Sequence, residues 1–243
     1  MQIFPLKTPI LKLAFDFEKV LEKALANANL VLEDSDILII ASKIVALQQG
    51  RIKKQKLKTK KNFLKDLVKK EANWISPYNG WLTLKDGIFI ANAGIDESNV
   101  PEGECILWPE KPYEFADKFC KKIKKKFGLR DFGIIICDSH CLPLRRGVTG
   151  VALGYAGFEG VPDLRGQKDL YGKILKHTTR NLADSLSSSA LIVMGESNES
   201  TPLALIRNAP VKFLNKKINP NDVKIPLKED LFFGVINLGE KKI

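Results

Sequence analysis

The sequence predicts an α+β fold in which helices pack on a mixed β-sheet. Two short apolar runs, residues 36–41 and 133–137, are typical of buried central strands. Segments with apolar residues at helical spacing lie between such runs and predict amphipathic helices. An Asp86-Gly87 hairpin signal interrupts this alternation of strand and helix segments. The pattern is therefore not that of a plain doubly wound parallel sheet.

The size of the chain favours one compact unit. Its 243 residues, 44% of them hydrophobic, suffice for a sizeable core. We expect a single domain over residues 1–243, with two intimate subdomains as the other arrangement. The first residues enter a strand-like segment, and no apolar run approaches membrane-spanning length. We therefore expect a cytoplasmic protein without a membrane partner.

The first half of the chain alternates between strand and helix signals. Residues 2–6 alternate like an edge strand, and residues 8–11 are expected to form a turn or loop. Apolar residues recur at helical spacing over residues 16–30, which predicts an amphipathic helix. The wholly apolar segment 36–41 follows, and its carboxyl end carries Ser42 and Lys43. Such an end is a common place for ligand contacts in open α/β sheets.

A hairpin and two lysine-rich helices come next. Residues 62–73 and 112–127 have one apolar face each, and Gly128 is a plausible C-cap for the second helix. The runs 81–84 and 88–91 flank the Asp-Gly turn. Residues 92–101 are too polar and glycine-broken for a core element. They form either a surface loop or a ligand-binding loop.

The last part of the chain is expected to add two more elements and two apolar runs. Residues 148–158 are strand-like, with small side chains that permit close packing. A helix is predicted over residues 178–191. Further apolar runs cover residues 203–207 and 231–238.

Charge and cysteine content exclude few classes of function. The formal net charge is +11, and lysines cluster in residues 51–70 and 118–126. Few aromatic residues lie between these lysines, so solvated helix faces and anionic small substrates fit better than nucleic acid. The four cysteines complete no zinc pattern with the two histidines. They are best explained as free thiols.

Acidic residues in two loops suggest a metal site. Asp138-Ser139 follows the strand 133–137 and offers a carboxylate and a hydroxyl to Mg²⁺ or Mn²⁺. The same pair could simply cap a helix. Asp96, in the glycine-rich loop 92–101, strengthens the metal interpretation. A phosphate-bound metal usually draws on one or two protein carboxylates.

Basic and glycine-rich motifs suggest phosphate binding. Arg145-Arg146-Gly147 could clamp phosphate or carboxylate, or form an ordinary surface pair. Arg165 and Lys168 could grip phosphate or form salt bridges with neighbouring acids. Residues 195–202 resemble a nucleotide-contacting turn, although no Walker A loop is present.

Taken together, five segments resemble the coenzyme F420-0:L-glutamate ligase family. The resemblance is collinear from the N-terminus to about Arg207 and rests on the combination, since each segment alone is weak. The segments are Asn92-Ala93-Gly94-Ile95-Asp96-Glu97-Ser98-Asn99-Val100, Ile136-Cys137-Asp138-Ser139, Arg145-Arg146-Gly147, Arg165-Gly166-Gln167-Lys168-Asp169-Leu170-Tyr171-Gly172 and Val193-Met194-Gly195-Glu196.

The resemblance implies an activity and a set of roles. The activity is GTP-dependent γ-glutamyl ligation: a carboxylate becomes an acyl phosphate and is attacked by the amine of L-glutamate. The fold implied is an unusual α+β arrangement that forms an intertwined homodimer. The implied metal ligands are Asp96, Asp138, Ser139 and Glu196. Nucleotide contacts carry over to Thr8, Pro9, Ile10, Leu11, Ser42, Lys43, Asn99, Gly195, Glu196, Ser197 and Pro202. We expect catalytic roles for Asp138, Arg145, Arg146 and Lys168, with Mg²⁺ or Mn²⁺, GTP or ATP, and K⁺ as a further option.

Two departures from the family pattern leave the acceptor open. Leu47-Gln48-Gln49-Gly50-Arg51 stands where the family usually has Lys-Ala-Glu-Gly-Arg, and Cys141-Leu142 replaces a Gly-Arg pair. The acceptor is the deazaflavin coenzyme precursor or, alternatively, a folate or pterin. A non-catalytic protein that binds nucleotide or nucleic acid is the alternative of another class.

Overall fold

The computed structural model describes residues 1–13, 15–55, 60–78, 80–226 and 229–232. A five-stranded mixed sheet forms its centre, in the order β1-β10-β2-β8-β9. Parallel pairing joins β2 (Asp36–Ala41) to β8 (Phe132–Cys141), and all other neighbours in this sheet are antiparallel. The predicted α+β class and mixed sheet are confirmed.

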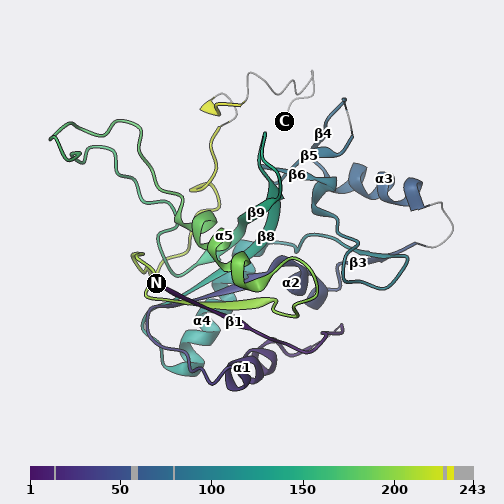
Figure 1. Ribbon diagram of the computed structural model, residues 1–243, viewed down its shortest axis with the longest axis horizontal. Helices are drawn as coiled ribbons and strands as arrows, with labels where there is room; N and C mark the ends of the chain where they lie inside the picture. The colour runs from purple at the N-terminus through teal and green to yellow at the C-terminus, as the bar shows by residue number, and fades with distance from the viewer. Residues whose placement is uncertain (14, 56–59, 79, 227–228, 233–243) are drawn as a thin grey trace.

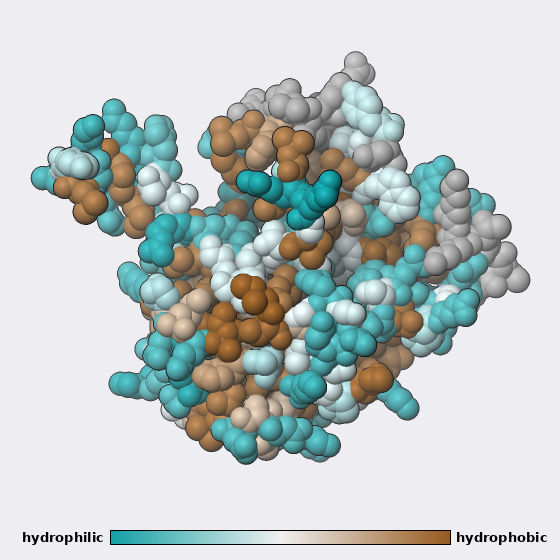
Figure 2. All heavy atoms as spheres, viewed as in Figure 1, coloured by the Kyte–Doolittle hydropathy of each residue, from teal (hydrophilic) through white to brown (hydrophobic). Residues whose placement is uncertain are grey.

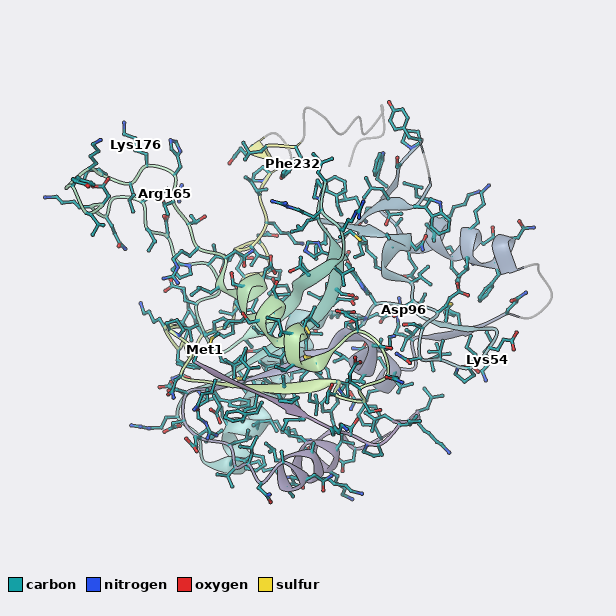
Figure 3. The ribbon with its side chains drawn as sticks, in the orientation of Figure 1. Met1, Lys54, Asp96, Arg165, Lys176 and Phe232 are labelled. Atoms are coloured by element: carbon teal, nitrogen blue, oxygen red, sulfur yellow. The ribbon has the colours of Figure 1, made fainter. Side chains whose placement is uncertain are left out.

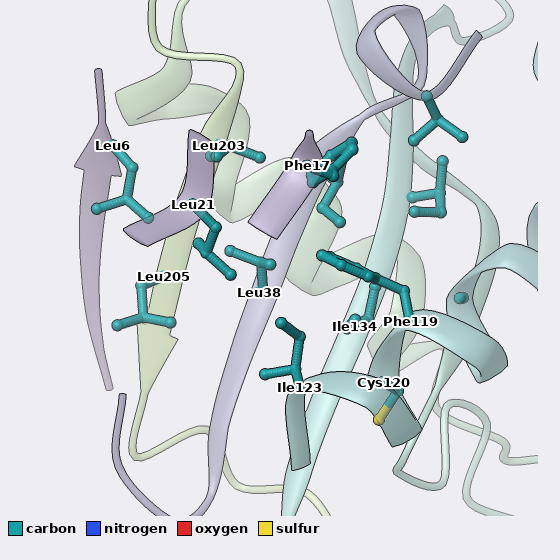
Figure 4. Close-up of a cluster of buried hydrophobic side chains, with 14 of the residues drawn as sticks. Leu6, Phe17, Leu21, Leu38, Phe119, Cys120, Ile123, Ile134, Leu203 and Leu205 are labelled. Carbon is teal, nitrogen blue, oxygen red and sulfur yellow. The ribbon is translucent and has the colours of Figure 1, made fainter. Parts of the chain in front are cut away.

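Helices cover both faces of this sheet (Figure 1). The helices α1 (Phe17–Asn27) and α4 (Pro112–Phe127) pack on one face, where Leu21 and Ile123 meet strand residues such as Ile134 (Figure 4). On the other face, α5 (Leu182–Met194) packs its Leu186 against Ile39 and Ile135. Alternate residues of each central strand thus feed two separate cores, as the period of two in a strand requires.

Local chemistry explains where several elements begin and end. The edge strand β1 (Gln2–Leu6) tolerates Pro5, which has no N–H to donate, as an edge position permits. The Asp16 carboxylate caps α1 by accepting from the amides of Glu18 and Lys19. Gly128 ends α4 with φ +67, as predicted.

A second group of elements lies beside the edge of the sheet. It contains α3 (Lys60–Glu71), the pair β3 (Ile52–Lys54) with β7 (Glu104–Ile106), and the three strands β4 (Trp74–Ile75), β5 (Leu82–Lys85) and β6 (Ile88–Ala91). The predicted hairpin is β5–β6, and Asp86 and Gly87 both have positive φ there. Small clusters around Val68, Trp74 and Trp108 hold these pieces together.

Three sequence expectations need correction. The strand 133–137 does not stop at Asp138; β8 continues to Cys141 because the antiparallel partner β9 (Val148–Ala156) pairs with it beyond the end of β2. The helix expected from residue 178 begins at Leu182, where the Asn181 side chain caps it. The strand expected to reach residue 158 ends at Ala156.

The other expected elements divide into confirmed and undescribed segments. The run 203–207 forms β10 (Leu203–Arg207), paired on both sides. Most of the apolar run 231–238 lies outside the described residues. Residues 8–11 form a loop, and residues 92–101 contain a short 3-10 turn, η1 (Asn92–Gly94).

A long arm projects from the body between β9 and α5 (green in Figure 1). It spans about residues 162–180, and its two limbs pair through isolated bridges Asp163–Thr179 and Lys168–Ile174. Leu170 and Tyr171 near its tip are almost fully exposed. The arm therefore makes its contacts chiefly within itself.

Candidate active site

The carboxylate of Asp138 lies where β8 extends beyond the end of its parallel neighbour β2. The last residue of β2 to pair with β8 is Ala41, opposite Cys137, and the helix α2 (Ser42–Gln48) starts at once. The Ser42 hydroxyl therefore reaches Asp138 and hydrogen-bonds its carboxylate. The amide of Ser139 donates to Oδ1 of Asp138 at 2.8 Å, and the indole N–H of Trp108 donates to Oδ2. Burial raises the pKa of Asp138 to about 6, although these hydrogen bonds favour the ionised form.

The loop after β6 brings a second carboxylate to the same place. Asn92, Ala93 and Gly94 all have positive φ, and this bend directs the chain back to Asp96, which bridges Ile106. Burial by itself would raise the pKa of Asp96. Hydrogen bonds from Lys43 and from the Ser98 amide outweigh burial and hold that pKa below its ordinary value.

Lys43, in the first turn of α2, joins this loop to the central sheet. Its ammonium lies 2.6 Å from Oδ2 of Asp96 and 2.9 Å from both the carbonyl oxygen and the hydroxyl of Ser98. The lysine thus fixes the loop relative to the end of β2.

We expect Lys43→Met to lower the free energy of unfolding at pH 7 by about 0.5 kcal/mol, since solvent screens a pair whose Asp96 side chain is 42% exposed. The lowered pKa of Asp96 means that the ion pair stabilises the fold fully above the unfolded-state pKa of about 3.9. This stabilisation is lost as pH falls through the folded-state pKa. Urea titrations of both proteins from pH 3 to 7, with the exposed Lys53→Met as control, measure it. A difference that does not shrink as the pH falls below about 3.9 would contradict the assignment.

The turn after α5 adds a third carboxylate. Gly195 has φ 76° and ψ 174°, a backbone conformation that essentially only glycine adopts. Glu196 accepts a hydrogen bond from the Ser139 hydroxyl, and burial together with nearby Glu199 and Asp96 raises its pKa. The Asn99 side-chain amide donates to the Ser197 carbonyl at 2.8 Å. The loops 92–101 and 195–202 are therefore in direct contact.

The predicted nucleotide-contacting residues gather around these two loops. The amide of Thr8 donates to the Ser200 carbonyl at 3.0 Å, and the amide of Ala41 donates to the Pro202 carbonyl at 2.9 Å. Pro9, Ile10 and Leu11 follow Thr8; Ile10 is 88% exposed, and Leu11 packs against the core below α1. Segments distant in sequence thus meet at one edge of the sheet.

The donor set at this edge suits a hard divalent cation. The negative charge of Asp96 makes ionisation of Asp138 less favourable, and it has the same effect on Glu196. In the described part of the chain, no three carboxylate, imidazole or thiol groups come close enough to form a metal site alone. One or two carboxylates, completed by a hydroxyl and phosphate oxygens, are the usual set for Mg²⁺ beside a nucleotide. The residues present fit such an ion.

Comparison with known proteins identifies the family. A model of the F420-0:gamma-glutamyl ligase family matches residues 5–208. The chain belongs to this family. Two proteins named coenzyme F420:L-glutamate ligase illustrate the similarity. That of Methanocaldococcus jannaschii is 37% identical over 84% of this chain and 87% of its own length. That of Methanothermobacter thermautotrophicus is 30% identical over 93% and 96%, respectively.

Membership of this ligase family confirms the resemblance seen in the motifs and the predicted class of enzyme, a ligase that forms carbon–nitrogen bonds. The matched region ends just after β10, at residue 208. It therefore includes all the loops described above. Within the residues that the structure describes, no helix combines the length and apolarity needed to cross a bilayer.

Three of the residues expected to be catalytic lie apart from the carboxylates within one chain. Arg145 and Arg146 are exposed in the turn between β8 and β9. Lys168 is exposed on the arm, which Figure 3 shows on the opposite side of the molecule from Asp96. Arg165 pairs with Asp163 at 2.6 Å, so the salt-bridge alternative describes this arginine. His140 lines a cavity next to the site.

Trp108 is a site residue that the sequence did not reveal, whereas Ser98 was among the possible ligand groups of the loop 92–101. Trp108 is 4% exposed, and its backbone carbonyl accepts from Arg51 at 3.1 Å while Lys85 lies over its ring. A buried tryptophan after a short strand usually signals core packing, so no sequence feature pointed to its bond with Asp138. Ser98 was proposed together with Asp96 and Asn99 as a ligand group of that loop, and its carbonyl oxygen and hydroxyl contact the Lys43 ammonium.

Proposed function

We propose that this protein adds L-glutamate through its amine to a carboxylate of coenzyme F420-0, using GTP and an acyl phosphate intermediate. The observation that carries the proposal is that Asp138 and Glu196 each interact electrostatically with Asp96, although the three come from distant segments, beside Ser139 and Lys43. Clustered carboxylates that disfavour one another's ionisation are suited to divalent cations and the phosphates those cations carry.

The proposed reaction has two steps, and the residues of the site have a role in them. The acceptor carboxylate attacks the γ-phosphorus of GTP and GDP leaves; the amine nitrogen of glutamate then attacks the acyl carbon, phosphate leaves, and the nitrogen loses a proton. Asp96, Asp138, Ser139 and Glu196 would hold Mg²⁺ or Mn²⁺, which supplies charge neutralisation on the transferring phosphoryl group. Lys43 is placed to bind phosphate oxygens once a cation takes over its contact with Asp96. The loops 92–101 and 195–202 position the nucleotide.

The exposed apolar residues of the arm are the observation that supports a homodimer. Leu170 is 101% and Tyr171 is 91% exposed, and Ile174 beside them is 52% exposed. Apolar side chains lie among the polar ones along the arm (Figure 2). A second copy of the chain is the proposed partner of this surface, and it would bring Lys168 or Arg165 toward an active site that one chain leaves without them. Light scattering tests this: a mass near twice 27.2 kDa is expected, and a monomeric mass would contradict the proposal.

Mass spectrometry of the acceptor tests the ligase function. The protein is incubated with L-glutamate, Mn²⁺ or Mg²⁺, K⁺ or Na⁺, and GTP or ATP; the acceptors are coenzyme F420-0, dihydrofolate and tetrahydrofolate. We expect the mass of F420-0 to rise by one glutamyl group with GTP, and ligation to fall by at least about 100-fold when EDTA removes the cation. Addition to a folate alone would replace the proposed acceptor. No addition to any acceptor would contradict the function.

A further inference from the structure

A cavity of about 960 Å³ lies beside the carboxylates, between the β5–β6 hairpin and the β8–β9 hairpin. Its volume falls within the range of pockets that bind cofactors and other small molecules. Trp81 and Phe89 come from the first hairpin, Leu153 from β9, and Tyr113 from the start of α4. The walls are thus mainly apolar and aromatic.

Three large apolar side chains around this cavity are exposed to solvent. Trp81 is 65%, Leu142 is 45% and Phe232 is 51% exposed, and each lines the cavity. Phe232 lies above the β8–β9 hairpin in Figure 3. Apolar side chains that gather around a hollow gain free energy when a flat apolar ligand covers them. The aromatic rings favour a planar partner, because stacked or edge-on contacts add to simple burial.

Trp108 forms a wall shared by the cavity and the carboxylate site. Its ring lines the cavity, while its indole N–H donates to Asp138. His140 also lines the cavity and follows Asp138 by two residues on β8. Two residues of a strand span roughly 7 Å. A ligand in the cavity therefore lies close enough for an attached carboxylate to reach the metal-binding side.

The polar groups of the cavity do not point to one ligand. The hydroxyl of Tyr113 is buried and has no hydrogen-bond partner among the described residues. This oxygen has almost no solvent-accessible surface, so it offers no contact to a ligand in the cavity as the structure stands. Charges at the cavity are mixed, since Lys111 and Lys224 line it together with Asp184 and other acids. The shape and aromatic lining of the cavity therefore indicate its ligand better than its net charge does.

We propose that this cavity holds the planar fused heteroaromatic ring of the acceptor, with the carboxylate to be ligated directed past Trp108 toward Asp138. The assignment rests on the proposed ligase function and adds the site that selects a cofactor precursor with a ring of this kind. It also places the Cys141-Leu142 departure from the family pattern at the cavity wall.

The test is the variant Trp81→Ala, in which a side chain 65% exposed is removed and the fold is checked by circular dichroism. We expect the KM for coenzyme F420-0 to rise about tenfold, the effect of losing one stacking partner. The KM values for L-glutamate and GTP should stay within twofold. Tyr78→Ala is the matched control, because Tyr78 is a 79% exposed aromatic residue near the same hairpin that does not line the cavity. An unchanged KM for F420-0 would overturn the proposal.

Direct binding separates failure of the ring site from failure of the function. Quenching of tryptophan fluorescence by F420-0 is measured without GTP or glutamate, so it needs no ligation. Binding that weakens about tenfold in Trp81→Ala supports the ring site even if the wild-type protein ligates nothing. Ligation by the wild type with equal F420-0 affinity in both proteins overturns the ring site and leaves the function standing. Absence of F420-0 binding by the wild type overturns the ring site as well.

Discussion

Replacing Asp138 by asparagine is expected to lower the rate of ligation by about 1,000-fold, which corresponds to roughly 4 kcal/mol of transition-state stabilisation. The change removes a negative charge from the centre of the carboxylate group but keeps an oxygen that can accept from the Ser139 amide or the Trp108 indole. Folding should therefore survive. Steady-state rates at saturating acceptor, together with circular dichroism, provide the measurement.

The matched control for this variant is Asp131→Asn. Asp131 immediately precedes β8, at the opposite end from Asp138, so the same chemical change is made away from the carboxylate group. Its rate should equal that of the wild type. If Asp138→Asn retained more than about a tenth of the wild-type rate, Asp138 would not hold the cation, and the metal-binding role would have to pass to Asp96 and Glu196.

Gly94→Ala is expected to lower the free energy of unfolding by about 3 kcal/mol. Gly94 has φ +70, where a side chain costs about 1 kcal/mol, and its new Cβ would overlap the indole nitrogen of Trp108. Overpacking of this kind adds roughly 1–3 kcal/mol. Because the displaced indole also binds Asp138, the rate of ligation should fall together with stability.

Gly103→Ala isolates the backbone part of that effect, so the difference between the two variants gives the steric part. Gly103 has φ +77, yet a Cβ there would meet nothing within 4 Å. Its loss of stability should be about 1 kcal/mol, and its ligation rate should be unchanged. Urea unfolding of both variants gives the comparison. Equal losses in the two would show that Trp108 moves without cost, and the expected overlap of the new side chain with Trp108 would be wrong.

The elements that the sequence predicted well have long apolar runs or apolar residues at helical spacing. The helix α4 has sixteen residues with a single apolar face, and β2 is an unbroken apolar run. The short helix α2 and the strands β3, β4 and β7 were missed. Strands of two or three residues exist only because a partner strand is present, and that partner is distant in sequence. Nothing within their own few residues distinguishes them from loops.

The candidate site was predictable in composition but not in arrangement. Asp96, Asp138 and Glu196 stood in polar segments next to apolar ones, and this contrast made them visible. The polar character of Asp138 and Ser139 also suggested that the strand ended there. It continues instead, because pairing depends on the backbone of β9 rather than on the side chains of β8. The contact from Trp108 depends on packing between hairpins, which no local pattern encodes.

The uneven pairing of β8 has a consequence for motion at the site. From Ile134 to Cys137 the strand has neighbours on both sides, whereas from Asp138 to Cys141 it pairs with β9 alone. Amide hydrogens of the first part should exchange with solvent only on global opening, and those of the second part on smaller, more frequent openings. The carboxylate end of the strand can therefore shift with a bound phosphate through turnover while the central sheet stays closed.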